Sequence, residues 1–153
     1  MSSADAFELY RSGLTLLERG DHHAAALPLR RARDLEPSTG MVREALGRAL
    51  FGARQFGDAA DEFGALVELE PMNAYAQFCL GRSLQLMGRH REARPPLTMA
   101  ALLKPDRADY RVYRDRTIAV LDRDEPEAAA EADAARALRA EQVRAQLPPR
   151  DDA

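Results

Sequence analysis

Three evenly spaced arginines are the side chains of this 153-residue chain best suited to bind another molecule. Arg48, Arg82 and Arg116 follow one another at intervals of 34 residues, and Phe51 and Phe78 lie within four residues of the first two. A guanidinium group stays charged, binds a carboxylate through two parallel hydrogen bonds and stacks on aromatic rings. The pattern therefore predicts a site for an extended ligand with acidic and apolar groups.

The same arginines have a simpler interpretation as solvated or internally paired side chains. Glu44 lies four residues before Arg48, on the same face of a helix, where such an ion pair contributes about 0.3–0.5 kcal/mol. Arg82 and Arg116 have no acidic residue three or four positions before them. The sequence leaves both interpretations open.

Residue patterns for catalysis or metal binding do not occur in the sequence. His22 and His23 are adjacent, which places them about 100° apart on a helix, and we interpret them, together with His90, as exposed turn residues. The single cysteine, Cys79, is interpreted as a packing residue. There is no HExxH motif, no cysteine pair and no glycine-rich loop after a strand. We expect no catalytic site, no metal and no cofactor.

The overall composition favours neither nucleic acid nor membrane as a partner. The 22 basic residues, all arginine except Lys104, are outnumbered by 25 acidic residues, so the formal net charge is -3. Any anion binding must therefore be local. The first residues lack a basic segment followed by an apolar one, and one cysteine allows no intrachain disulfide, so we expect a cytoplasmic protein. The preference for arginine over lysine indicates a bacterial source.

The elements that must position these side chains repeat with the same period. Small and helix-ending residues recur every 34 positions, in the sets Gly13, Gly47 and Gly81; Ala25, Ala59 and Ala93; and Pro37, Pro71 and Pro105. Apolar residues recur at steps of three and four, which predicts two amphipathic helices per unit. We expect each glycine to approach the helix that carries the matched alanine. Pro28, Pro95 and Pro96 fall inside second helices and predict kinks or late helix starts.

The 34-residue period, with segments such as AYAQFCLGRSLQLMGRHREARPPLTMAALLKP, resembles the tetratricopeptide repeat. The resemblance covers three units, at 6–39, 40–73 and 74–107, after an N-terminal tail of residues 1–5. It implies an all-α fold, a right-handed superhelix of antiparallel helical hairpins. The chain departs from the family at an early bulky aromatic position, where it has Leu9, Arg43 and Gln77. We expect these residues to weaken the packing of the first helices.

The repeat pattern decays toward the C-terminus. Residues 108–147 are interpreted as a degenerate fourth unit, in which Asp115 replaces the expected glycine, and a capping helix that begins near Pro126. The end of a repeat array needs such a helix with a polar outer face, because no further unit covers it. Residues 148–153 are expected to form a disordered tail.

In the family, the first helices of successive hairpins line a concave groove, and the resemblance places the candidate binding residues there. They are Phe7, Tyr10, Leu14, Arg48, Phe51, Tyr75, Phe78, Arg82, Tyr113 and Arg116. The carboxylate clamp with which some family members hold chaperone tails is missing. The positions that form this clamp in the family are occupied here by Tyr10, Leu14, Ala45, Tyr75 and Cys79. None of these side chains is a cation or an amide.

These patterns lead to one functional hypothesis and two alternatives. The hypothesis is a non-catalytic scaffold whose concave groove binds a protein or peptide segment with acidic and apolar groups. The first alternative is a structural protein that self-assembles through the groove or an end helix, as a homo-oligomer. The second is a secretion-type chaperone, since small three-repeat chaperones of similar length occur in the family.

Overall fold

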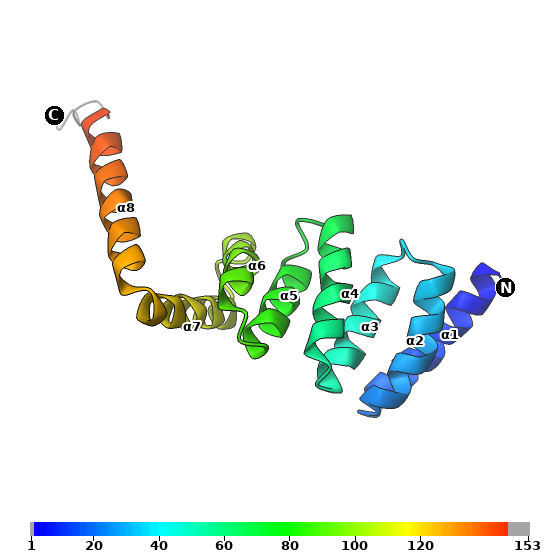
Figure 1. Ribbon diagram of the computed structural model, residues 1–153. Helices are drawn as coiled ribbons and strands as arrows, with labels where there is room; N and C mark the ends of the chain where they lie inside the picture. Colours follow the sequence, from blue (N-terminus) through cyan, green and yellow to red (C-terminus); the bar gives the residue numbers. More distant parts are fainter. Residues whose placement is uncertain (1, 147–153) are drawn as a thin grey trace.

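The computed structural model describes residues 2–146, apart from the side chains of residues 126–129, and within that range the chain forms eight helices and no strand. The helices are α1 (Ser3–Glu18), α2 (His22–Leu35), α3 (Gly40–Gly52), α4 (Phe56–Leu69), α5 (Ala74–Leu86), α6 (His90–Leu103), α7 (Ala108–Asp124) and α8 (Pro126–Gln146). Figure 1 shows them stacked as an elongated array with α1 and α8 at opposite ends. The expected all-α solenoid of helical hairpins is confirmed.

The helix boundaries follow the period of the sequence. The helices α3, α5 and α7 begin at Gly40, Ala74 and Ala108, which are 34 residues apart. The N-terminal boundary differs from expectation, because α1 already begins at Ser3 rather than after a tail of residues 1–5. The Asp5 carboxylate accepts a hydrogen bond of 2.7 Å from the backbone amide of Ser2, which satisfies a free donor at the helix start. The tail expected at residues 148–153 lies outside the described residues.

A continuous apolar core fills the space between the paired helices. Its largest fully buried side chains include Leu29, Leu46, Phe63 and Leu97. Three of these side chains explain the repeated glycines. A Cβ atom on Gly47 would lie 2.8 Å from the Phe63 ring. A Cβ atom on Gly13 or Gly81 would likewise lie too close to the side chain of Leu29 or Leu97. The glycines therefore admit a large side chain four positions after each alanine. The expected close approach of each glycine to the helix that carries the matched alanine is confirmed.

Two of the three residues that replace the family aromatic tie a first helix to the loop before it. The Arg43 side chain donates a hydrogen bond of 2.9 Å to the Pro37 carbonyl oxygen, and Gln77 donates one of 3.0 Å to the Pro71 carbonyl oxygen. Each bond spans six residues and satisfies a backbone carbonyl oxygen in the loop before the helix. These side chains hold the loop in place instead of packing as an aromatic ring would.

A buried carboxylate joins the first two hairpins. Glu62 of α4 is 4% exposed and forms ion pairs with Arg33 of α2 and, at 2.8 Å, with Arg43 of α3. A carboxylate can be buried when charged donors surround it in this way. The three helices are therefore joined by charge as well as by the apolar core.

The prolines within second helices do not delay the helix starts. Pro28 lies inside α2, and Pro95 and Pro96 lie inside α6, which begins at His90. A proline gives up one amide donor in a helix. Here Leu29 and Leu97 next to the prolines are fully buried, so packing against the first helices keeps these segments helical. Of the two alternatives predicted, kinks or late helix starts, the late starts are therefore wrong.

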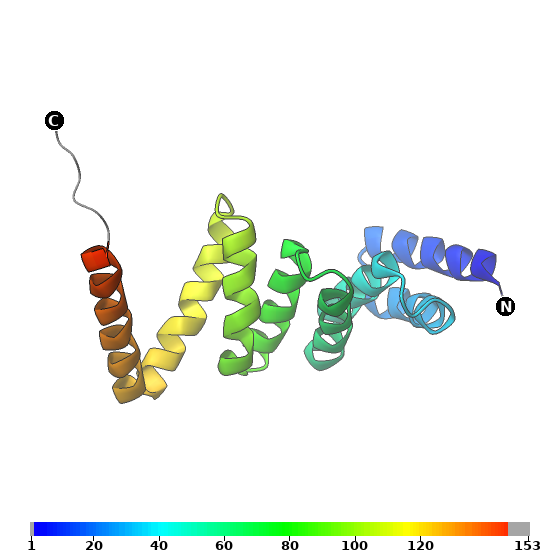
Figure 2. The ribbon, with the colours of Figure 1, turned by 90° about the horizontal axis from the view of Figure 1, so that it is seen from above.

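The last helix stands apart from the stacked hairpins. Figure 2 shows α7 and α8 meeting in a V, with α8 directed away from the other helices. Only Glu125 separates α7 from α8, and its carboxylate forms an ion pair with Arg91 of α6. Among the described side chains of α8, Ala135 is half-buried and the others are exposed.

Candidate binding groove

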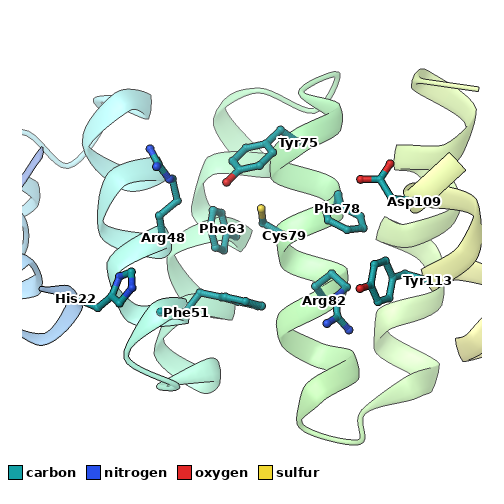
Figure 3. A pocket seen from close by; sticks show the side chains of 11 residues that line it. His22, Arg48, Phe51, Phe63, Tyr75, Phe78, Cys79, Arg82, Asp109 and Tyr113 are labelled. Atoms are coloured by element: carbon teal, nitrogen blue, oxygen red, sulfur yellow. The ribbon is translucent and has the colours of Figure 1, made fainter. Parts of the chain in front are cut away.

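The first helices α3, α5 and α7 line a cavity of about 520 Å³. Residues from α2 and α4 complete its wall, and Figure 3 shows it from close by. The residues that line it are His22, Arg48, Phe51, Gly52, Phe63, Tyr75, Phe78, Cys79, Arg82, Asp109 and Tyr113. Cavities of this volume, mostly apolar with a few polar groups, are typical of binding sites.

Aromatic side chains form much of the cavity surface. The Phe78 ring stacks on the Tyr110 ring of α7 with 4.4 Å between the centroids, and lies 5.7 Å from that of Tyr113. Phe51 meets Phe56 of α4 edge to face at 5.2 Å. These contacts hold the rings in fixed orientations, while the Tyr75 side chain keeps 39% of its surface exposed. The cavity therefore presents a preformed apolar surface to an incoming side chain.

Two arginines share one aromatic ring at the C-terminal side of the cavity. The Arg82 guanidinium lies 3.9 Å from the Tyr113 ring centroid, and that of Arg116 lies 4.9 Å from it. Burial lowers the pKa of Arg82, and the neighbouring charge of Arg116 acts in the same direction. Both effects disfavour the charged form. The negative charge of a carboxylate placed here would offset both effects by favouring the charged guanidinium.

Hydrogen bonds through Gln85 fix the position of the Arg82 side chain. Its guanidinium donates to the Gln85 side-chain oxygen at 2.5 Å. The Gln85 amide donates to the Tyr113 carbonyl oxygen at 2.9 Å and to the Thr117 hydroxyl at 2.7 Å. Gln85 thus connects α5 to α7, and it orients the arginine without supplying a negative charge.

Arg48 occupies the opposite side of the cavity. Figure 3 places its side chain across from Arg82, with Phe51, Phe63 and Cys79 between them. The Arg48 side chain is exposed. Glu44, four residues earlier, does not pair with it, since the described part of the chain contains no ion pair to Arg48, Arg82 or Arg116. The internally paired interpretation is therefore not the arrangement found.

The Cys79 thiol lies in the middle of the cavity wall. Burial raises the pKa of Cys79 to about 11, and the charge of Glu44 adds to this, whereas Tyr75 and Arg48 act in the opposite direction. Burial also raises the pKa of the neighbouring Tyr75 hydroxyl. Both groups are therefore neutral near pH 7 and contribute surface rather than charge.

The structure divides the ten sequence-predicted groove residues among several places. Six of them line the cavity, namely Arg48, Phe51, Tyr75, Phe78, Arg82 and Tyr113. Arg116 stacks on the outside of this group through Tyr113. Phe7 and Tyr10 instead line a second cavity of about 270 Å³ between α1 and α3. Leu14 packs against the core beneath it.

Sequence reasoning missed the contribution of His22. We expected an exposed turn residue, but the His22 side chain is partly buried and lines the cavity. The reason is Gly52, where a Cβ atom would lie 2.2 Å from the His22 ring. The histidine at the start of α2 fills the space that this glycine leaves at the end of α3. A glycine in one hairpin that is paired with a ring in the preceding hairpin is not visible as a sequence motif.

The cavity carries an acidic residue whose charge is already compensated. Asp109 forms an ion pair with Arg107 at 2.7 Å, which lowers the pKa of Asp109. The unpaired charges around the cavity are therefore the three arginines and Glu44.

Across the described residues, no three histidine, cysteine or acidic side chains come together in a way that would hold a metal ion. None of the described helices has the length and apolar character needed to cross a membrane.

Comparison with solved structures identifies the fold. The first tetratricopeptide domain of Spaghetti (RPAP3), bound to the HSP90 peptide SRMEEVD, superposes with a TM-score of 0.72 at 17% identity, covering 79% of this chain and 96% of that one. MamA from Desulfovibrio magneticus RS-1 gives 0.72 at 24% identity, over 83% and 71% of the two chains. SycD, the type III secretion translocator chaperone of Yersinia enterocolitica, gives 0.63 at 17% identity, over 80% and 84%.

No protein-family model matches the sequence, and no curated protein matches it either. The solved structures nevertheless agree with the 34-residue period and the stacked hairpins. The tetratricopeptide-repeat fold implied by the sequence is therefore confirmed.

Proposed function

We propose that this chain is a non-catalytic scaffold that binds a protein segment with acidic and apolar side chains in the cavity between α3, α5 and α7. The observation that carries the proposal is the Arg82–Tyr113–Arg116 group beside an aromatic cavity. Two guanidinium groups on one ring form no ion pair within the described chain, and an arginine fork is suited to a carboxylate. An acid on the ligand would pair with them while an adjacent apolar side chain enters the cavity.

The similarity to a peptide-bound structure supports this use of the groove. The RPAP3 domain was solved with an HSP90 peptide whose sequence, SRMEEVD, contains three acids. The present chain offers arginines at different groove positions, and the clamp positions hold Tyr75 and Cys79 among others. We therefore expect it to select an acidic segment with a bulky apolar residue rather than a chaperone tail. The similarity to SycD is a likeness of fold, and we do not extend it to a chaperone role.

A peptide-selection experiment tests the proposal. A displayed library of random peptides is selected on the immobilised chain, and selected peptides are labelled and measured by fluorescence polarisation. We expect enrichment of aspartate or glutamate close to leucine or phenylalanine. Versions with asparagine or glutamine in place of the acids should bind at least roughly tenfold more weakly, since charge-assisted hydrogen bonds contribute about 1.5–3 kcal/mol.

Matched variants assign the effect to the arginines. In R82A/R116A, the acidic peptide and its amide version should bind with nearly equal affinity. Arg89 serves as the control, because it is an exposed arginine just before α6 that pairs with Glu92. R89A should bind like the unmodified chain. Equal enrichment of acidic and neutral peptides, or an equal loss in R89A, would contradict the proposal.

A further inference from the structure

We propose that the groove also receives α8 of a second copy of this chain, so that copies associate head to tail. The inference rests on the proposed function, since it names one partner for the same groove. It is carried by an exposed acidic and apolar face on α8, for which the groove offers arginines and an aromatic cavity.

The helix α8 has the exposure of an element that lacks a partner. Leu138 keeps 57% of its surface exposed and Val143 keeps 59%. Figure 1 shows α8 standing away from the stacked hairpins over most of its length. Near its start, Ala132 and Arg136 line a shallow hollow with Leu121 of α7. Further along the helix, Leu138 and Val143 belong to none of the apolar clusters of the described chain.

One face of α8 combines acids with apolar groups. Glu131, Ala134, Leu138, Glu141 and Ala145 are spaced by three and four residues, which places them on one side of a helix. The described ion pairs include neither glutamate. By contrast, Asp133 is paired with Arg136 within the helix. This face therefore carries two free negative charges on either side of an exposed leucine.

The groove offers the complementary chemistry on three different helices. Glu131 and Glu141 are ten residues apart, a rise of about 15 Å along a helix, so their carboxylates can reach arginines on different helices. A helix lying across α3, α5 and α7 would thus place one glutamate near Arg48 and the other near Arg82 and Arg116. Leu138 between them would enter the aromatic cavity.

The contact must form between copies and not within one. A single residue, Glu125, joins α7 to α8, and its ion pair with Arg91 holds that corner. Figure 2 shows α8 directed away from the groove-forming helices at this corner. The groove and α8 are two different surfaces of the chain. A contact between the groove of one copy and α8 of another is therefore head to tail. Such contacts close into rings or extend into chains.

The test is sedimentation velocity over a range of concentrations, with two charge-reversal variants. R82E/R116E disables the groove and leaves α8 intact, whereas E131R/E141R disables α8 and leaves the groove intact. We expect the unmodified chain to form larger species as concentration rises, and each variant alone to lose them, because like charges then face each other. Circular dichroism of each variant verifies that the helices remain folded.

Mixing the two variants gives the decisive result. One variant supplies an intact α8 and the other an intact groove, and their two reversed surfaces also carry opposite charges, so an equimolar mixture should associate although neither variant does so alone. R139E, a reversal on another side of α8, is the control and should associate like the unmodified chain. A strictly monomeric unmodified chain, equal association of R82E/R116E, or a mixture that stays monomeric would overturn the inference. Selection of acidic peptides by such a monomeric chain would leave the proposed function standing, whereas failure of both would remove both.

Discussion

The guanidinium group of Arg82 on α5 lies 3.9 Å from the centre of the Tyr113 ring on α7. Arg116, one turn further along α7 from Tyr113, approaches the same ring at 4.9 Å. Cations attract the negative face of an aromatic ring, so Tyr113 stabilises two like charges that would otherwise repel each other. The result is a doubly positive position beside an apolar cavity.

Replacing Tyr113 tests the importance of this ring. Y113A removes the surface on which both arginines stack, and we expect acidic peptides to bind roughly tenfold more weakly, since a partly desolvated cation–π contact contributes about 0.5–2 kcal/mol. Y113F keeps the ring and should bind within about twofold of the unmodified chain. Fluorescence polarisation with one acidic peptide measures all three. Equal losses in Y113F and Y113A would show that the hydroxyl, and not the ring, is required.

The Cys79 thiol reports on groove occupancy and on pH. Because burial raises the pKa of Cys79 to about 11 from an ordinary value near 9, the thiolate is scarce at pH 8 and alkylation by iodoacetamide should be slow. The rate should rise as pH increases toward 11 while the fold persists. In the unfolded chain the thiol ionises at lower pH. The contribution of this thiol to the free energy of unfolding is therefore fully present below pH 9 and is lost as the pH rises through 11.

A bound acidic peptide should slow alkylation of Cys79 further, because the thiol lies in the wall of the cavity. The modified fraction is measured by mass spectrometry with time, at pH 8 and pH 10, with and without peptide. The more weakly binding amide version of the peptide, at the same concentration, serves as the control. A rate at pH 8 equal to that in denaturant would contradict the burial of this thiol.

Much of the fold could be predicted because one physical signal repeats. Gly47 with Phe63, and Pro71 at the following helix end, belong to patterns that recur every 34 residues, and a periodic signal averages out local exceptions. The all-α hairpin solenoid followed directly. The partner of each glycine did not follow, because a glycine indicates a close approach without indicating what approaches it.

The candidate groove was predictable in part. Arg82 and Tyr113 could each be placed on a groove face, but the stacking between them depends on the spacing of α5 and α7, which no sequence pattern gives. His22 was misplaced because its position depends on Gly52 in a different hairpin. Arg43 and Gln77 were assigned by comparison with an aromatic position, whereas their hydrogen bonds to loop carbonyls depend on the reach of long polar side chains.

Removing the buried carboxylate of Glu62 should destabilise the N-terminal half of the solenoid. E62A leaves Arg33 and Arg43 without their shared partner, and losing one member of a buried ion pair costs about 3–5 kcal/mol. The two arginine side chains keep 26% and 19% exposure, so water offsets part of this loss and we expect about 2–3 kcal/mol. Urea denaturation measures the change. E92A, which breaks an exposed pair with Arg89, should change stability by less than about 0.5 kcal/mol.

Two glycine-to-alanine changes in one hairpin should have opposite effects. In G47A the new methyl group would lie 2.8 Å from the buried Phe63 ring, and forcing atoms into a packed core costs about 1–3 kcal/mol. In G64A, within α4, the nearest atom would be Leu80 Cδ1 at 3.9 Å, which is an ordinary contact. Alanine then stabilises the helix by up to about 1 kcal/mol over glycine.

Thermal and urea denaturation of G47A and G64A measure this difference. A double variant, G47A with F63L, supplies the further control. Leucine occupies the position of Phe63 in the first and third hairpins, as Leu29 and Leu97, but there too a Cβ atom on the facing glycine would lie within 2.6 Å of it. We therefore expect F63L to leave G47A destabilised. Recovery of full stability in that double variant would show that the aromatic ring alone, and not the close approach of α3 and α4, requires the glycine.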